Sequence, residues 1–238
     1  MENIMQVNSL KLEALRPLGK WRILDLKSLM ELSEVPIGYW NLHKIIKRFE
    51  KAKVVQSFKD PWTKRKMIYL EALGHGLLGV EKNCTISNET LLHDSKVSLV
   101  LRMMFNRGIF KEVLLEHELS RKLFFAGELS PDAIMKGEKN GKKFSMAFEL
   151  ELTRKAHERA LAKAKHYLNF SLVDYVFYQF CSEGLFQSYK KLFLEKLPEG
   201  WNNKIMMFCN TSLMSSCFSL ENGKGFFKNR EVSFAEIF

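Results

Sequence analysis

Three acidic side chains in the second half of the chain carry the clearest chemical signal. Asp132 follows Pro131, and Glu149 and Glu151 flank a single leucine. Carboxylate oxygens brought together from two neighbouring strands are the ligands that Mg²⁺ and Mn²⁺ prefer. A metal held there can activate water or stabilise the leaving oxygen of a phosphodiester. We therefore take Asp132, Glu149 and Glu151 as candidate metal ligands and candidate catalytic residues.

Two strands joined by a hairpin must position these carboxylates. An Asn-Gly pair at 140–141 is a strong hairpin signal, and it separates a strand expected at 131–136 from one expected at 143–152. Side chains alternate along a strand, so Glu149 and Glu151 share one face. Two other interpretations stay open. The glutamates can form a solvent-facing edge paired with Lys143 or Lys155, and Asp132 can simply begin its strand.

The first 80 residues are basic, with 14 Lys and Arg against 8 Asp and Glu. A helix expected at 37–52 has one apolar stripe, formed by Leu42, Ile45, Ile46 and Phe49. Its other face is polar and cationic, and the residues that we expect to bind DNA there are Asn41, Lys44, Lys47, Arg48 and Lys51.

A basic hairpin follows this helix. Strands are expected at 54–58 and 66–70, with an Asp-Pro turn and the side chains of Trp62, Lys64 and Arg65 between them. Shorter helices are expected earlier, one stopped by Pro17 and one over 23–32. This order predicts a winged helix-turn-helix, with the helix at 37–52 in the major groove and the wing on phosphates. The same pattern also fits a solvated helix face or a protein-interaction module.

The remaining elements predict a second domain of mixed α+β or α/β class. Helices are expected at 94–106, at 153–168 with Thr153 as its cap, and at 187–197. Strands are expected at 109–115, 174–180 and 204–208, and the segment 116–124 fits either a helix or a loop. A mixed sheet flanked by helices satisfies this order. We therefore expect a winged helix-turn-helix domain at 1–80, a linker at 81–90, and a second domain at 91–238.

The acidic motifs resemble those of the restriction-endonuclease-like nucleases, whose pattern is Pro-Asp, a spacer and acid-x-Lys. Pro131-Asp132 and Glu149 match this pattern, whereas Glu151 stands at the lysine position. In that family the lysine orients or deprotonates the attacking water. The resemblance therefore implies a nuclease-like core in which Lys155 takes over the role of that lysine.

A longer run of motifs, over about residues 15–180, resembles the replication-relaxation family. The motifs are Leu92-His93-Asp94, Phe110 to Glu118, Pro131 to Ile134, Phe148 to Thr153, Arg159 and Tyr167. That family consists of plasmid and mobile-element proteins with a winged helix-turn-helix, and it is similar to the mobilisation relaxases. The resemblance implies a DNA-binding protein of replication control, mobilisation or transcription regulation. The alternatives are a metal-dependent nickase and, with less support, a protein-interaction module on a vestigial nuclease core.

The composition limits which partner and which cellular location these interpretations allow. The 238 residues carry a net charge of +10, which favours an acidic partner such as double-stranded DNA. The four cysteines have no zinc-site spacing and are expected to be reduced thiols. No apolar run is long enough for a membrane span, and the N-terminus lacks a signal-peptide pattern, so we expect a cytoplasmic protein. Winged-helix proteins are often dimers, but no coiled-coil seam points to a homodimer here.

Overall fold

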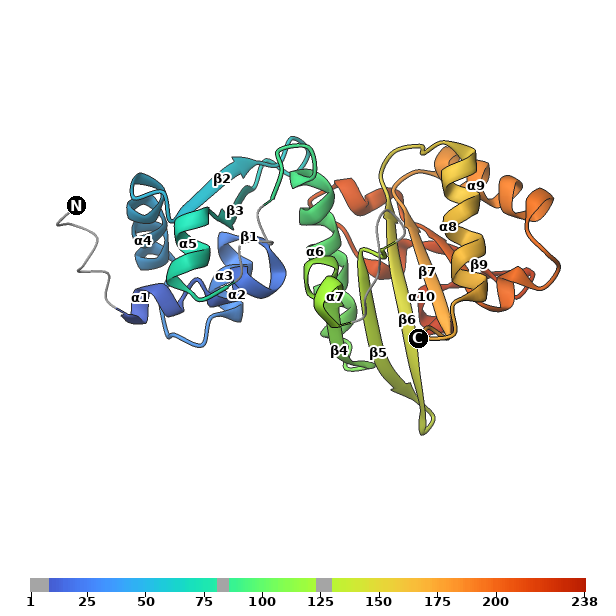
Figure 1. Cartoon of the computed structure of the whole chain (residues 1–238). Helices are drawn as coiled ribbons and strands as arrows, with labels where there is room; N and C mark the ends of the chain where they lie inside the picture. Colours follow the sequence, from blue (N-terminus) through green and yellow to red (C-terminus); the bar gives the residue numbers. More distant parts are fainter. Residues whose placement is uncertain (1–8, 81–85, 123–129) are drawn as a thin grey trace. The chain divides into compact units, whose positions relative to one another are not determined.

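The computed structural model describes residues 9–80, 86–122 and 130–238 (Figure 1). The expected class, a mixture of helices and strands, is confirmed. The chain divides into two compact units between Leu99 and Val100, inside helix α6 (Leu91–Phe105). Part of the linker expected at 81–90, residues 81–85, lies outside the described residues, as do Cys84 and the end of the segment 116–124.

The N-terminal unit combines short helices with a small sheet. Its described elements before α6 are α1 (Ser9–Glu13), α2 (Arg16–Trp21), β1 (Ile23–Asp25), α3 (Leu26–Leu32), α4 (Tyr39–Lys51), β2 (Val55–Lys59), β3 (Lys66–Leu70) and α5 (Ala72–Leu77). Within the described part of the chain, β1, β3 and β2 form an antiparallel sheet in that order. The apolar stripe of α4 is buried as expected, so this helix turns its polar face outward.

Two expectations for this unit were wrong in detail. The segment from Ile23 is not helical at first: Ile23–Asp25 pairs with β3, and the Asp25 carboxylate then accepts the amide of Ser28 at 2.9 Å to cap α3. Pro17 does not stop a helix but lies in the first turn of α2, where its missing N–H costs nothing.

A buried ion pair fixes the turn between β2 and β3. The carboxylate of Asp60 accepts the amides of Trp62 and Thr63 at 2.9 and 3.0 Å. It also pairs with the ammonium of Lys96 on α6 at 2.8 Å, and both side chains are almost fully buried. Burial by itself raises the pKa of Asp60, but these hydrogen bonds hold it below its ordinary value. The conformation of the hairpin tip therefore depends on a residue 36 positions away in the sequence.

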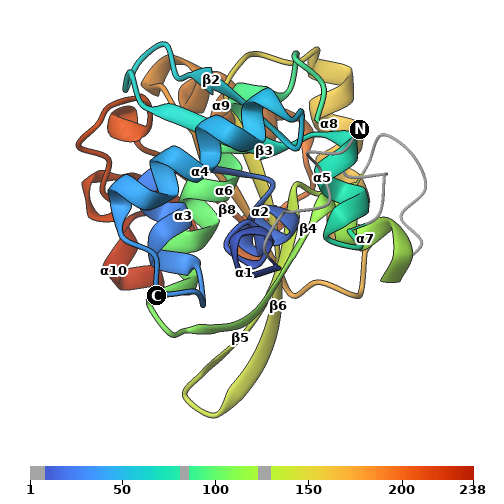
Figure 2. The same ribbon diagram turned by 90° about the vertical axis from the view of Figure 1, so that its left-hand side faces the viewer.

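The C-terminal unit is built on a large sheet. Its strands are β4 (Phe110–Leu115), β5 (Ala133–Lys139), β6 (Lys142–Glu151), β7 (Tyr175–Phe180), β8 (Ile205–Cys209), β9 (Lys224–Phe227) and β10 (Arg230–Ser233). Of the described strands, seven follow one another in spatial as well as chain order. β6, β7 and β8 are parallel, and the other neighbours are antiparallel. The hairpin of β5 and β6 projects beyond the rest of the sheet in Figures 1 and 2.

Helices cover both faces of this sheet. α8 (His157–Asn169) and α9 (Glu183–Lys196) pack on one face, in a core that includes Tyr167, Tyr178 and Phe193. On the other face, α10 (Phe234–Ile237) places Phe234 against Phe208, with 5.7 Å between the ring centroids. α7 (Glu116–Lys122) is a further helix of this unit. No helix among the described residues is long and apolar enough to cross a membrane.

Several boundaries differ from those expected. Thr153 does not cap α8, which begins at His157 after Ala156. α9 begins earlier than expected because Ser182 caps it, accepting the amide of Leu185 at 3.4 Å. β5 continues to Lys139, so the turn is limited to Asn140 and Gly141, both with positive φ.

Removing the ammonium of Lys96 tests the role of the buried pair. We expect Lys96→Met to lower the free energy of unfolding of the N-terminal unit by about 3–5 kcal/mol, because it leaves the Asp60 carboxylate buried without its counter-charge. Denaturant titration followed by tryptophan fluorescence measures this, since Trp21, Trp40 and Trp62 all lie in that unit. The exposed Lys59→Met is the matched control. A loss below about 1 kcal/mol, the range of a surface ion pair, would contradict this assignment.

Candidate nucleic-acid interface and buried carboxylate cluster

The outward face of α4 carries the cations expected from the sequence. Lys44, Lys47, Arg48 and Lys51 are exposed, as is the amide of Asn41. Their spacing of three and four residues places them along one stripe of the helix. None of the four cations forms an ion pair with another residue of the described part of the chain. The stripe is thus an uncompensated positive surface, suited to an acidic partner.

Aromatic side chains lie beside this stripe. Trp40, in the first turn of α4, is 74% exposed, and Tyr39 next to it is 45% exposed. Trp62 at the tip of the hairpin is 51% exposed. Trp62 was expected from the sequence and Trp40 was not, although an aromatic pair directly before a basic helix face was a readable signal. Large exposed rings flanked by cations are unusual on a surface that only meets water.

The hairpin tip carries three cations, each with a partner. Lys64 and Arg65 are exposed, and the ammonium of Lys64 donates to the carbonyl of Pro61 at 2.5 Å. Arg65 lies 3.7 Å from the carboxylate of Asp25, and Lys66 pairs with Glu50 of α4 at 2.6 Å. The second pair ties the hairpin to α4, so the basic helix face and the basic tip are held in one arrangement.

The three carboxylates of the C-terminal unit gather at the pairing of β5 and β6. Asp132 lies directly before β5, and its carboxylate accepts the amide of Leu150 at 2.7 Å. Glu149 and Glu151 lie on β6, on the face covered by α8 and α9, and are 0% and 2% exposed. The alternative of a solvent-facing edge is therefore wrong. The glutamates are part of the interior.

Basic and phenolic groups already occupy these carboxylates. The ammonium of Lys163 on α8 donates to Oε2 of Glu149 at 2.7 Å, and the hydroxyl of Tyr167 donates to Oε1. Lys155 donates to Oε1 of Glu151 at 2.9 Å. Lys163 is itself buried, so its ammonium is not available to a phosphate group of DNA. Lys155 lies before α8 and pairs with Glu151.

Burial controls the protonation of the cluster. It raises the pKa of Glu149 to about 7, with a further upward contribution from the charge of Asp132, although Lys163 and Tyr167 oppose this. Burial also raises the pKa of Glu151, against the pull of Lys155. The carboxylates around Lys163 outweigh its own burial and raise its pKa. Lys163 therefore stays charged across the range in which Glu149 titrates.

A further polar side chain, that of Tyr178, lines this interior. Tyr178 on β7 lies opposite Glu149 in the strand register, and burial and the neighbouring carboxylates raise the pKa of its phenol. Its hydroxyl and Oε2 of Glu151 are buried without a hydrogen-bond partner among the described residues. The sequence gave no sign of Tyr178, because a tyrosine in an apolar strand is indistinguishable from an ordinary core residue.

The arrangement does not fit a divalent metal. Within the described residues, no group of three His, Cys, Asp or Glu side chains is placed to hold one. Both oxygens of Glu149 are engaged by Lys163 and Tyr167, and one oxygen of Glu151 by Lys155. Asp132, Glu149 and Glu151 are thus close together as expected, but their charge is balanced by lysines.

The remaining residues expected from the longer motif lie elsewhere. His93 and Asp94 are in the first turn of α6, 3.4 Å apart, and Asp94 pairs with Arg22 at 3.1 Å inside the N-terminal unit. Comparison with known proteins found no protein-family model that matches the chain and no curated protein that matches it. The function of the chain is therefore inferred from the geometry of these sites.

Replacing Glu149 by glutamine tests its protonation. Glu149 has a pKa of about 7 in the folded chain and 4.5 as its ordinary value. The folded state therefore keeps a proton that the unfolded state has lost, and stability from this group falls as the pH rises between these two values. We expect the wild type to lose free energy of unfolding relative to Glu149→Gln over this range, measured by urea titration at several pH values. Parallel curves for the two proteins, with exposed Glu195→Gln as control, would contradict the raised pKa.

Proposed function

We propose that this chain is a DNA-binding protein whose N-terminal unit engages duplex DNA. The observation that carries the proposal is the row of exposed cations on α4, none of them paired within the described residues. Phosphates are the acidic groups that such a surface meets on DNA, and an α-helix of this size enters the major groove.

The order of elements supports a winged helix-turn-helix. α3, α4 and the hairpin of β2 and β3 follow one another, and β1 adds a third strand. In this proposal α4 is the recognition helix, with Asn41 in reach of base edges and Lys44, Lys47, Arg48 and Lys51 on phosphates. Trp62, Lys64 and Arg65 act on the wing. A protein-interaction module has less support, because it does not require an unpaired cationic stripe.

We further propose that the C-terminal unit is a nuclease-like scaffold used without cleavage. Three antiparallel strands, a helix and a parallel strand, β4 to β7 with α8, fit the restriction-endonuclease-like core expected from the motifs. The resemblance to the replication-relaxation family supports a role in replication control, mobilisation or transcription of a plasmid or mobile element. Double-stranded DNA is the proposed partner, and a homodimer is compatible with it.

Metal-dependent nicking is the second candidate function. It is favoured by the gathering of Asp132, Glu149 and Glu151 and by the pKa of Glu149 near 7, since perturbed acids concentrate at active sites. Buried ion pairs that are purely structural shift pKa values in the same way. The engagement of Glu149 by Lys163 and Tyr167 supports binding over cleavage.

Charge reversal on α4 tests the DNA-binding proposal. We expect Lys47→Glu with Arg48→Glu to weaken binding to duplex DNA by roughly tenfold or more at moderate salt, and to reduce the salt dependence of the affinity by about two phosphate contacts. Fluorescence anisotropy of a labelled duplex over a range of salt concentrations measures both quantities.

Lys191→Glu with Lys196→Glu is the matched control, because it makes the same change of charge on exposed positions of α9. It is expected to keep wild-type affinity. Unchanged affinity of the α4 variant, or equal loss in the control, would remove α4 from the DNA interface.

Incubation with supercoiled plasmid separates binding from nicking. We expect the wild type and Asp132→Ala to shift the plasmid on a gel equally and to leave it uncut with Mg²⁺ or Mn²⁺, because Lys163 neutralises Glu149. Metal-dependent nicking by the wild type that Asp132→Ala loses would establish the enzyme instead.

A further inference from the structure

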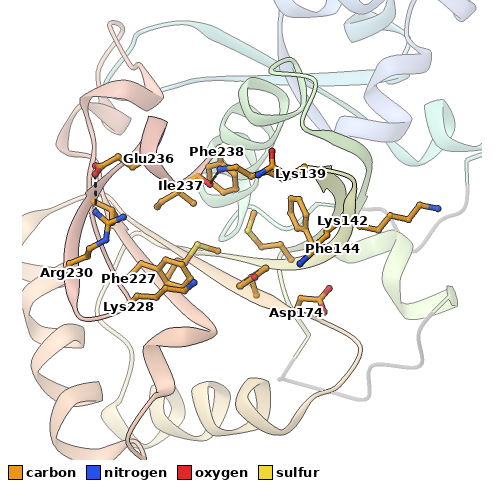
Figure 3. Close-up of a pocket in the computed structure, with 16 residues that line it drawn as sticks. Lys139, Lys142, Phe144, Asp174, Phe227, Lys228, Arg230, Glu236, Ile237 and Phe238 are labelled. Carbon is orange, nitrogen blue, oxygen red and sulfur yellow. Dashed lines mark hydrogen bonds and ion pairs between the residues drawn. The ribbon is translucent and has the colours of Figure 1, made fainter.

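A second site lies in the C-terminal unit, beside the turn end of the β5–β6 hairpin. It is a hollow of about 540 Å³, a size typical of small-ligand pockets. Strands β6, β7, β8, β9 and β10 and the segment around α10 contribute to its walls. Figure 3 shows the Arg230–Glu236 pair at one end, Phe227 and Lys228 beside it, and Lys139, Lys142 and Phe144 at the other end.

This hollow is separate from the carboxylate cluster. Phe144 and Met146 line it, whereas Glu149 and Glu151 have the opposite parity along the same strand. Side chains alternate between faces, so the hollow opens on the face away from α8 and α9. None of the residues that line the hollow belongs to the proposed DNA-binding surface on α4 and the β2–β3 hairpin.

The hollow is positively charged. Of the described residues that line it, five are Lys or Arg and two are acidic. Glu236 forms an ion pair with Arg230 at 3.2 Å, and the carboxylate of Asp174 accepts a hydrogen bond from the backbone amide of Ser145 at 2.7 Å. Lys142, Lys143 and Lys228 have no ion-pair partner in the described part of the chain. Lys142 and Lys228 are therefore available to an anionic ligand on this face, since Lys143 has the parity of Glu149 along β6.

Aromatic rings form a continuous row in the same walls. Tyr175 lies between Phe144 and Phe227, with 6.2 Å between the ring centroids on either side. All three rings are only partly buried. Lys228 lies 5.3 Å from the ring of Phe227, so one cation and one aromatic surface meet at the same wall. Rings left open to solvent beside cations can stack on a planar, electron-rich group.

We propose that this hollow binds a nucleotide, with its base against the ring of Phe227 and its phosphate on Lys228, while Lys142 adds positive charge at the other end of the aromatic row. A simple anion would leave the aromatic row without a contact, and an apolar ligand would leave the unpaired lysines without a counter-charge. A nucleotide contacts both the rings and the lysines. It comes either as a free mononucleotide or as one unit of a single-stranded nucleic acid, for which cations and stacking rings are the usual combination.

Calorimetric titration of the full-length protein tests this site. The probes are dTMP, a short single-stranded oligothymidine and inorganic phosphate. We expect Lys142→Glu with Lys228→Glu, and separately Phe227→Leu, each to weaken nucleotide binding by roughly tenfold. Lys191→Glu with Lys196→Glu is the charge-matched control and keeps the affinity. Urea titration of each variant establishes that it is folded, and Phe227→Leu preserves an apolar side chain in β9.

The outcomes distinguish the sources of the ligand and the two proposals. Binding of dTMP supports a site for free nucleotides, and binding of the oligothymidine alone supports a site for a displaced strand. Binding that neither variant weakens, binding of phosphate as strong as that of dTMP, or no binding of either nucleotide probe would overturn the proposal. Lys47→Glu with Arg48→Glu must leave this site unchanged, so its failure and that of the duplex-binding proposal are separable.

Discussion

The ion pair between Glu149 and Lys163 is the interaction on which the C-terminal unit depends. A carboxylate with no exposure to solvent is costly to bury, and removing one partner of such a pair leaves the other charge uncompensated. The pair joins strand β6 to the helix α8 at 2.7 Å, and Tyr167 adds a second contact from the same helix. These polar contacts therefore fix the position of α8 on a face of the sheet that is otherwise apolar.

The neutralised carboxylates fit the proposal that the C-terminal unit is used without cleavage. The carboxylates are gathered by strand pairing, which is a property of the fold and persists whatever their role. The lysines that neutralise them come from α8 and from the segment before it. An ammonium at 2.7 Å partly compensates the buried charge of Glu149. Exposed cations without an ion-pair partner among the described residues include those of the α4 stripe and Lys142 and Lys228 of the hollow near the β5–β6 hairpin.

Local patterns were readable in the sequence, whereas partners distant along the chain were not. The apolar stripe of α4 and the Asn140-Gly141 turn depend on neighbours within a few residues, and both were predicted. β1 was missed because three residues become a strand only when β3 pairs with them. Nothing in the local sequence marks Lys163 as buried, because its burial depends on the crossing of α8 over β6, 14 residues from Glu149.

The C-terminal segment shows the same limit. β9 and β10 are four residues each and are rich in residues that also suit loops, so no periodicity marked them. The aromatic row of the hollow draws on β6, β7 and β9, and its cations on β5, β6 and the turn between β9 and β10. Such a site exists only once the sheet is assembled, and no spacing along the chain predicts it.

We infer that Lys163, rather than a divalent metal, balances the charge of the carboxylate cluster. Titration of the wild-type protein with Mn²⁺, followed through the electron paramagnetic resonance signal of the free ion, tests this inference. We expect no saturable Mn²⁺ site that depends on the cluster, so that the wild type and Asp132→Ala give the same titration. Saturable Mn²⁺ binding by the wild type that Asp132→Ala abolishes would contradict it.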